Sequence, residues 1–395
     1  MKINRFSYHD KARGWRLEPV QLKDLTLLIG ASGVGKTLIL DSILTLQAIA
    51  DGSSFKGVEW EIEFETIENL KYKWKGAFEN KGYDYFSIAA AVSTSEKEKI
   101  KEKNKPGILY EEVFLNNKQV VKRSREEIIF NGGKTPRLSQ QESIIKLLKE
   151  EDAVAPAYNG FKKIISSKAA ESKGSEFPKF SIISGEFVRR VELRKYGTLK
   201  DIRLSDENIA TKLFLAYKNV PEVFNKIKER FIDIFPQVED IKIEPIKIEA
   251  EIDPFIKEQP YIQIKECGVN KWIHQFRISS GMFRALMHIS ELYLVSDGTL
   301  ILIDEFENSL GVNCIDELTN EVITAKRNLQ FIITSHHPYI INNIDFKHWK
   351  LVTRNADIVK LLEPESLNLG KSKHDAFIQL INLEQYRNGI GIEVE

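Results

Sequence analysis

Eight residues near the N-terminus have the types and spacing of a phosphate-binding loop. They read Gly30-Ala31-Ser32-Gly33-Val34-Gly35-Lys36-Thr37 and match the pattern G-x-x-x-x-G-K-[ST]. In such a loop the glycines let backbone N–H groups turn toward phosphate oxygens, the lysine reaches the β- and γ-phosphates, and the threonine hydroxyl can ligate Mg²⁺. The pattern therefore predicts that these residues, together with Leu38, bind a nucleotide.

The residues on either side of this loop have the order strand, loop, helix that phosphate binding requires. The apolar run Leu25 to Ile29 precedes the loop, and Thr37 to Leu46 follows it with apolar residues at helical spacing. A glycine-rich turn without a ligand is the alternative, and the flanking elements favour the binding loop.

A second candidate site lies at the end of a continuous apolar run. Residues Thr299 to Ile303 are followed by two adjacent carboxylates, Asp304 and Glu305. Such a run is typical of a strand buried on both faces, as in a parallel sheet. We expect Asp304 to hold Mg²⁺ with Thr37, and Glu305 to polarise the attacking water, because phosphoryl transfer depends mainly on the placement of charge, metal and water. Two surface acids at a strand end are the alternative.

The composition is that of a globular protein with balanced charge. The chain has 395 residues, 42% of them hydrophobic, with 57 basic and 57 acidic residues. This length allows one large domain or two smaller ones, and the balance means that any contact with DNA must be local. No apolar run approaches the roughly 18 residues that span a bilayer, and no signal peptide is apparent. Cys267 and Cys314 lack metal-ligand spacing, so we expect buried thiols in a cytoplasmic protein with no membrane partner.

Hydrophobic periodicity divides the chain into three lobes. Strict alternation in Glu59 to Glu65 and in Tyr72 to Phe78 predicts an antiparallel sheet after the first helix. From about Ser139 the period becomes helical, and strand-like alternation resumes after Pro236. We expect a nucleotide-binding lobe over residues 1–140, a helical insertion over 141–236 and a C-terminal lobe over 237–395.

Three further segments occur in an order that resembles a known family. Ile278-Ser279-Ser280-Gly281-Met282-Phe283-Arg284 resembles the ABC signature in the divergent form of RecF- and OLD-like ATPases. Glu307-Asn308-Ser309-Leu310 resembles the D-loop, and Phe331 to Pro338 resembles the strand that carries the switch histidine. The likeness covers residues 1–50 and 270–345. The sequence is therefore similar to ABC-type ATPase heads of the SMC/RecF/OLD class, close to small ATPases of bacterial anti-phage systems such as PARIS and Septu.

The resemblance implies an α/β fold, namely an ABC-type P-loop NTPase head with an N-terminal antiparallel or mixed sheet, a core parallel sheet and a helical insertion. It also implies a homodimer or higher homo-oligomer that binds two ATP molecules, with Mg²⁺, head to head. Ser279, Ser280 and Gly281 would then face the γ-phosphate of ATP on the partner, since they open a helix. An ordinary helix N-cap is the alternative. Ser280 stands where transporters have glycine, which argues against a transporter subunit.

The resemblance also assigns roles to single residues. His336 would bond the γ-phosphate and act in catalysis, although a histidine at a strand end is often structural. Gln140 would touch Mg²⁺ as the Q-loop glutamine, and the alternative is a helix start with Ser139 as its N-cap. Trp15 and Arg13 are candidates for contacting adenine or phosphate.

The leading hypothesis is an ATP-hydrolysing ATPase of an anti-phage defence system that controls a separately encoded effector protein. A RecF-like DNA repair or recombination ATPase is the alternative, and a nucleotide-gated scaffold with little turnover is a third. DNA would be bound by local clusters of basic residues, for which a solvated surface balanced by acids is the other explanation. The clusters contain Lys118, Lys122, Arg123, Arg125, Lys134, Arg137, Arg189, Arg190, Arg194 and Lys195.

Overall fold

Two compact units make up the chain. The computed structural model describes residues 1–81, 105–166, 196–245, 260–307, 319–320, 322, 327–367 and 373–390. The first unit contains Met1–Ile165, Gly298–Asp304 and Asn328–Glu395, and the second contains Ser166–Asp297 and Glu305–Arg327. These boundaries differ from those of the three expected lobes, because strands from the C-terminal part of the chain join the sheet of the first unit.

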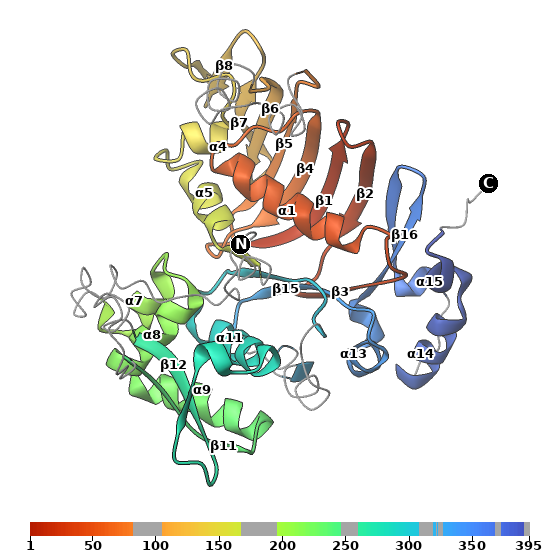
Figure 1. The fold of residues 1–395 in the computed structure, drawn as a ribbon. Coiled ribbons are helices and arrows are strands. Elements are labelled where there is room, and N and C mark those ends of the chain that lie inside the picture. Colours follow the sequence, from red (N-terminus) through yellow and green to blue (C-terminus); the bar gives the residue numbers. More distant parts are fainter. Residues whose placement is uncertain are drawn as a thin grey trace, which may run out of the picture. The chain divides into compact units, whose positions relative to one another are not determined.

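A large mixed sheet is the framework of the first unit (Figure 1). Its strands are β1 (Lys2–Asp10), β2 (Trp15–Gln21), β3 (Leu25–Ile29), β4 (Val58–Glu65), β5 (Lys71–Phe78), β6 (Ile108–Leu115), β7 (Lys118–Arg123), β8 (Ile128–Phe130), β9 (Gly133–Lys134), β10 (Ile164–Ser166), β14 (Leu300–Ile303), β15 (Gln330–Thr334), β16 (Trp349–Asn355) and β17 (Ile358–Leu362). Within the described residues their order is β10-β14-β15-β3-β16-β17-β2-β1-β4-β5-β6-β7-β8-β9. Strands β14, β15, β3 and β16 pair in parallel, whereas β2, β1 and β4 to β9 pair antiparallel. The expected α/β class, with a parallel core and an antiparallel part, is confirmed.

Helix α1 and the antiparallel strands enclose much of the apolar core of the first unit (Figure 1). The helices of this unit are α1 (Lys36–Ala50), α4 (Ile144–Leu147), α5 (Ala155–Lys162), α13 (Pro338–Asn343), α14 (Lys373–Asn382) and α15 (Glu384–Asn388), with the 3₁₀ turns η4 (Phe346–His348) and η5 (Pro364–Leu367). Alternation in β4 and β5 turns Trp60, Phe64 and Trp74 into the core. Phe161 of α5 lies edge-on to Phe64 and Trp74, with ring centroids 5.2 and 5.0 Å apart.

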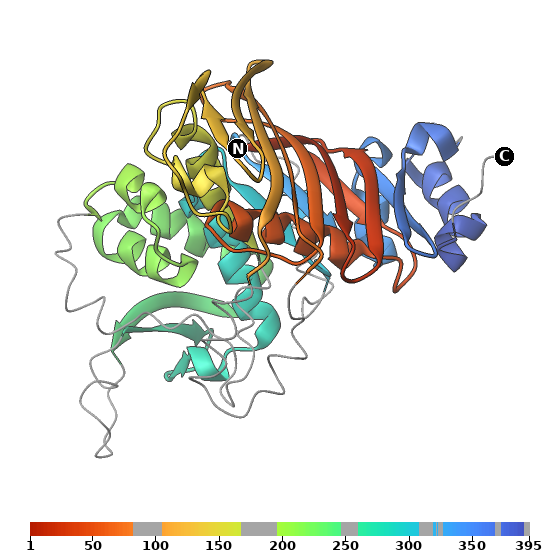
Figure 2. The same cartoon turned by 90° about the horizontal axis from the view of Figure 1, so that it is seen from above.

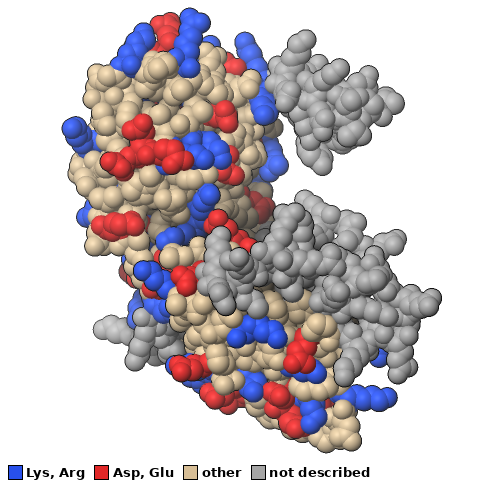
Figure 3. Space-filling view, turned by 90° about the vertical axis from the view of Figure 1, so that its left-hand side faces the viewer, with Lys and Arg blue, Asp and Glu red and all other residues tan. Residues whose placement is uncertain are grey.

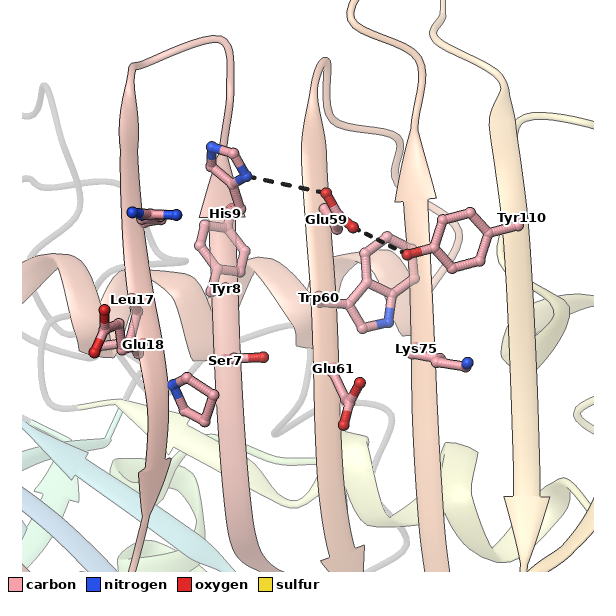
Figure 4. Close-up of a pocket in the computed structure, with 12 residues that line it drawn as sticks. Ser7, Tyr8, His9, Leu17, Glu18, Glu59, Trp60, Glu61, Lys75 and Tyr110 are labelled. Carbon is pink, nitrogen blue, oxygen red and sulfur yellow. Dashed lines mark hydrogen bonds and ion pairs between the residues drawn. The ribbon is translucent and has the colours of Figure 1, made fainter. Parts of the chain in front are cut away.

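The opposite face of the antiparallel strands is charged and solvated. Strand β4 presents glutamates and β5 presents lysines, so that Lys73 Nζ lies 2.7 Å from a carboxylate oxygen of Glu61. A shallow cavity of about 420 Å³ lies on this face (Figure 4). There the Tyr110 hydroxyl donates to Glu59 over 3.1 Å, and His9 Nδ1 lies 4.0 Å from the same carboxylate. The paired charges explain how this face is stable in contact with water.

The second unit combines helices with a small antiparallel sheet. Its elements are α7 (Leu199–Leu204), α8 (Ile209–Asn219), α9 (Pro221–Ile234), β11 (Val238–Pro245), β12 (Pro260–Glu266), β13 (Trp272–His274), η3 (Gln275–Arg277) and α11 (Ser280–Leu294). Helices α8 and α9 pack against α11, and every third or fourth residue of α9 is buried, among them Phe224, Ile227 and Phe231.

Cys267 is exposed in the turn after β12, so the expectation of a buried thiol is wrong there, and Cys314 lies outside the described residues. No helix in the described part of either unit has the length and apolar character to cross a bilayer.

A buried ion pair ties the segment before α4 to the sheet. Glu111 of β6 and Arg123 of β7 are almost fully buried, and Glu111 Oε2 lies 3.5 Å from the Arg123 guanidinium. The carboxylate also accepts hydrogen bonds from Trp74 Nε1, the Ser143 hydroxyl and the Ile144 backbone N–H. Arg123 in turn donates to two backbone carbonyls of the segment before α4, each over 2.7 Å. Burial raises the pKa of Glu111, and its hydrogen-bond donors and Arg123 oppose that shift.

Replacement of Glu111 tests this network. Glu111→Ala leaves Arg123 buried without its acidic partner, so we expect the free energy of unfolding to fall by about 3–5 kcal/mol. Glu112→Ala is the matched control, because Glu112 is the next residue of the strand and its ion pair with Lys75 is partly exposed. We expect a loss below about 1 kcal/mol for the control. Equal losses in urea denaturation would show that the buried pair does not stabilise the sheet.

Candidate nucleotide site

The loop between β3 and α1 has a backbone that only glycine allows. All five residues of β3 are buried, and the chain then turns through Gly30, Gly33 and Gly35 with φ angles of 139°, 84° and 107°. A Cβ atom on Gly30 would lie 2.6 Å from the carbonyl oxygen of Val352, so a side chain is excluded by contact as well as by φ. The glycines predicted from the sequence are therefore the residues that shape this loop.

Positive charge and helix geometry favour an anion inside the loop. Lys36 Nζ donates to the carbonyls of Gly30 and Ala31 over 2.7 and 2.8 Å, so its ammonium group lies against the loop. Helix α1 starts at Lys36 without a side-chain cap. The first backbone N–H groups of a helix and its positive dipole end form an anion site. Ser32 and Gly33 are exposed at the loop, whereas Val34 is buried on its outer side.

Three side chains from separate segments meet at the carboxyl ends of the parallel strands. The Thr37 hydroxyl donates to Asp304 Oδ2 over 2.9 Å, and the Thr334 hydroxyl donates to Asp304 Oδ1 over 2.7 Å. Thr37 follows β3, Asp304 follows β14 and Thr334 ends β15, and these strands are neighbours in the sheet. We refer to Thr37, Asp304 and Thr334 as the Asp304 cluster.

The Asp304 cluster fits Mg²⁺ bound together with a nucleotide. Mg²⁺ prefers oxygen ligands and is usually held by one or two carboxylates, phosphate oxygens and water. The Thr37 hydroxyl and the Asp304 carboxylate are close enough to touch one ion. No group of three or more His, Cys, Asp or Glu side chains within the described ranges could hold a metal.

Thr334 is a site residue that the sequence analysis did not single out. The residue is 1% exposed. The N–H of the next residue, Ser335, donates to the carbonyl of Leu28 in β3, which keeps the end of β15 paired with β3. The sequence feature that could have identified Thr334 is a hydroxyl residue at the end of a buried strand, two residues before His336. The side chain of His336 is exposed, and α13 begins two residues later.

Glu305 follows Asp304 with an unusual backbone. Its φ is 47°, in the left-handed region, which costs a residue with a side chain about 1–3 kcal/mol. The next residue, Phe306, is buried, and its ring lies 6.1 Å from that of His288 on α11. Burial of Phe306 supplies a packing force that holds this turn, while the Glu305 side chain remains exposed.

The predicted signature residues open α11 in the second unit. The Ser279 side chain is the N-cap and accepts a hydrogen bond from the Met282 N–H over 3.2 Å. Ser279 and Ser280 are exposed and Gly281 is half-buried. The N-cap interpretation therefore holds within one chain, and a contact with the nucleotide of a partner remains a prediction. Of the expected D-loop, only Glu307 belongs to the described residues.

The structure does not bring Gln140 to the Asp304 cluster. Its side chain donates to the carbonyl of Arg125 over 3.4 Å. Lys146 of the following helix α4 lies 2.6 Å from Asp51, the C-cap of α1, whereas the P-loop lies at the other end of α1. A helix of this length spans about 22 Å. A role for Gln140 as a metal ligand at the cluster does not fit this geometry.

The expectation that Trp15 contacts adenine needs correction. Trp15 is 4% exposed and packs against Tyr8 with ring centroids 5.4 Å apart, so it has no free face for adenine. Arg13 is exposed in the turn between β1 and β2, near Asp10, and its contact with adenine or phosphate stays a prediction. A side chain at an inward position of a strand joins the core whatever its stacking capacity.

Solved structures to which this chain is similar include heads of Smc proteins. The Smc head domain with an extended coiled coil bound to the C-terminal domain of ScpA, from Pyrococcus furiosus, is 12% identical with a TM-score of 0.50, covering 92% of this chain and 97% of that chain. The SmcHead bound to the C-winged helix domain of ScpA is 13% identical with a TM-score of 0.49 and the same coverage. The SMC head domain from Thermotoga maritima is 11% identical with a TM-score of 0.42, covering 92% and 99%. At 12% identity, the match with the TM-score of 0.50 is informative about the fold alone.

The fold and the P-loop together define a P-loop ATPase domain of the ABC type. The sequence profile of a family described as "AAA domain, putative AbiEii toxin, Type IV TA system" matches residues 25–342. The chain belongs to this family. No curated protein sequence matches this chain.

Thr334→Val tests the Asp304 cluster. The substitution keeps the shape of the side chain and removes the hydrogen bond to Asp304, so we expect Mg²⁺-dependent nucleotide binding to weaken about tenfold as the carboxylate loses its orientation. Thr353→Val is the control, because Thr353 is an equally buried threonine of the same sheet outside the cluster. Calorimetric titration with ADP in the presence and absence of Mg²⁺ measures the effect. If both variants bind ADP with Mg²⁺ as tightly as the wild type, Thr334 does not contribute to the site.

Proposed function

We propose that this protein binds ATP with Mg²⁺ at the P-loop and hydrolyses it, as an ATPase of a bacterial anti-phage defence system that controls a separately encoded effector. The observation that carries the ATPase part is the Asp304 cluster, in which hydroxyls from α1 and β15 meet the carboxylate at the end of β14. Phosphates held in the loop and a metal ion at this edge would lie in direct contact.

The residues of the site divide the chemistry between them. The loop N–H groups and Lys36 bind the β- and γ-phosphates and neutralise their charge. Thr37 and Asp304 would hold Mg²⁺, which would supply positive charge next to the phosphates. Glu305 accepts a proton from the attacking water and orients it, and His336 donates a hydrogen bond to the γ-phosphate.

We further propose that two copies assemble head to head on ATP. Ser279, Ser280 and Gly281 of one copy would then complete the site of the other. In support, these residues form the N-terminus of a 15-residue helix, where backbone N–H groups and the helix dipole favour a phosphate. The exposure of Ser279 and Ser280 is compatible with such a contact.

Two comparisons support a defence role with a protein partner. The family description names a putative toxin of a Type IV TA system, which is consistent with a multicomponent defence system. The Smc head from Pyrococcus furiosus is solved with a domain of ScpA bound, so a head of this fold can carry a second protein. The effector is therefore proposed as a protein encoded apart from this chain.

The basic residues considered for DNA give little support to that alternative. Arg123 is buried, Arg125 lies 2.8 Å from Glu79, and Lys134 is paired with an acidic neighbour. Figure 3 shows Lys and Arg side chains interspersed with Asp and Glu on one face of the molecule, whereas a DNA backbone requires a basic track. The residues Arg189, Arg190, Arg194 and Lys195 lie outside the described residues.

Glu305→Gln separates binding from hydrolysis. The amide keeps the shape of the side chain and is a poor base, so we expect ATP turnover to fall at least about a hundredfold while ATP still binds. Bound ATP should hold two copies together as a dimer in light scattering. Lys36→Ala is the control without nucleotide binding, and Gly281→Arg should bind ATP without dimerising because its bulk blocks the contact in trans. Turnover at the wild-type rate would exclude Glu305 as the base.

The same variants identify the partner. Each variant is purified from cells that also express the neighbouring genes. We expect one separately encoded protein to co-purify in stoichiometric amount with one of the two variants, the ATP-trapped Glu305→Gln protein or the nucleotide-free Lys36→Ala protein. The same protein should be absent from the other preparation. The absence of such a protein, combined with ATP turnover that DNA stimulates and salt abolishes, would instead favour a DNA repair ATPase.

A further inference from the structure

The residue that ends helix α15 lies against the P-loop. Helix α15 ends at Gly389, whose φ of 71° is left-handed. A Cβ atom on Gly389 would overlap Cγ1 of Val34 and would lie 3.3 Å from Cβ of Ala31. The Gly389 carbonyl accepts a hydrogen bond from the Arg354 N–H over 2.7 Å, which fixes the helix end to β16. Glycine is therefore required twice at this position, by φ and by close approach to the loop.

The C-terminal helices of the first unit reach the segment that carries His336. Helix α14 packs against α15 on one side and against α13 on the other (Figure 1). Helix α13 starts at Pro338, two residues after His336. Figure 2 shows these C-terminal helices, coloured blue, gathered beside the strands of their own unit. A packed pair of helices thus joins the loop that would bind the phosphates to the segment that would sense the γ-phosphate.

The contact of Gly389 differs from the other supports of the loop. Gly30 and Gly35 lie against Val352 and Val359, which belong to strands β16 and β17 of the sheet. Those strands cannot move without loss of their ladder hydrogen bonds. Helix α15 is not a strand of the sheet, so its movement away from Val34 would break the Arg354–Gly389 hydrogen bond but none of the strand pairs of β16 and β17. The contact between Gly389 and Val34 therefore depends on the position of this one helix end.

We propose that α14 and α15 couple the P-loop to the segment of His336. Seating of Gly389 on Val34 holds the loop in its phosphate-binding shape, and bound nucleotide in turn holds α15 in place. By thermodynamic linkage the two effects have the same size. This inference rests on the proposed nucleotide binding and assigns Gly389 as a positioning residue for the loop. A partner that displaces these helices would thereby change the nucleotide affinity of the protein.

Gly389→Ala is the direct test, with ADP and Mg²⁺ as the ligand in calorimetry. The added methyl group overlaps Val34, so we expect the affinity for ADP to fall about tenfold. Val34→Ala removes the overlapping atom, and the double variant should therefore return to within about threefold of Val34→Ala alone. Gly132→Ala is the matched control, because Gly132 also has a left-handed φ of 83° but has open space around it.

Hydrogen exchange on the wild type provides a second measurement that needs no substitution. The Arg354 N–H donates to Gly389, so its exchange rate reports how often this contact opens. We expect saturating ADP to slow this exchange by about the same factor by which the Gly389→Ala substitution weakens ADP binding. Unchanged exchange, or an unchanged affinity of Gly389→Ala, would overturn the coupling while leaving nucleotide binding in place. Failure of the wild type to bind ADP would overturn the proposed function itself.

Discussion

The carboxylate of Asp304 accepts hydrogen bonds from Thr37 and Thr334, and the whole nucleotide site depends on this convergence. The three residues are far apart in the sequence and meet because β14, β15 and β3 are parallel neighbours whose carboxyl ends lie at one edge. A partly buried carboxylate is costly without donors, and two hydroxyls at this edge supply them. The P-loop and the start of α1 lie at the same edge, so the groups suited to phosphate and to a metal ion are neighbours of the Asp304 carboxylate.

The P-loop is shaped by what lies outside it as much as by its own glycines. Gly30 lies against a backbone carbonyl of β16, Gly35 against Val359 of β17, and Val34 against Gly389 after α15. Each contact limits the space for a side chain, and Lys36 adds hydrogen bonds to the carbonyls of Gly30 and Ala31. In a loop of this kind the backbone N–H groups bind phosphate oxygens.

Local patterns predicted much of the fold, because each concerns neighbours in the sequence. The buried run of β3, the loop glycines and the helical spacing after Thr37 identified the phosphate-binding element, and alternation identified β4 and β5. Predictions failed where a side chain's surroundings come from distant segments. Trp15 has the ring that adenine stacking would need but lies inside the core beside Tyr8. Arg123 was grouped with surface cations, and Glu111 on the neighbouring strand draws it into a buried pair.

The sequence by itself therefore determined the kind of chemistry: a glycine-rich loop with Lys36 and Thr37, and a buried strand ending in Asp304 and Glu305, are local patterns with few other uses. Tertiary structure alone decided which further residues join them. It brought Thr334 to Asp304, placed the Gln140 side chain against the carbonyl of Arg125, and placed Gly389 against Val34. The physical reason is that strand order and close packing are set by the sum of many weak contacts across the sheet, and no short stretch of sequence contains that sum.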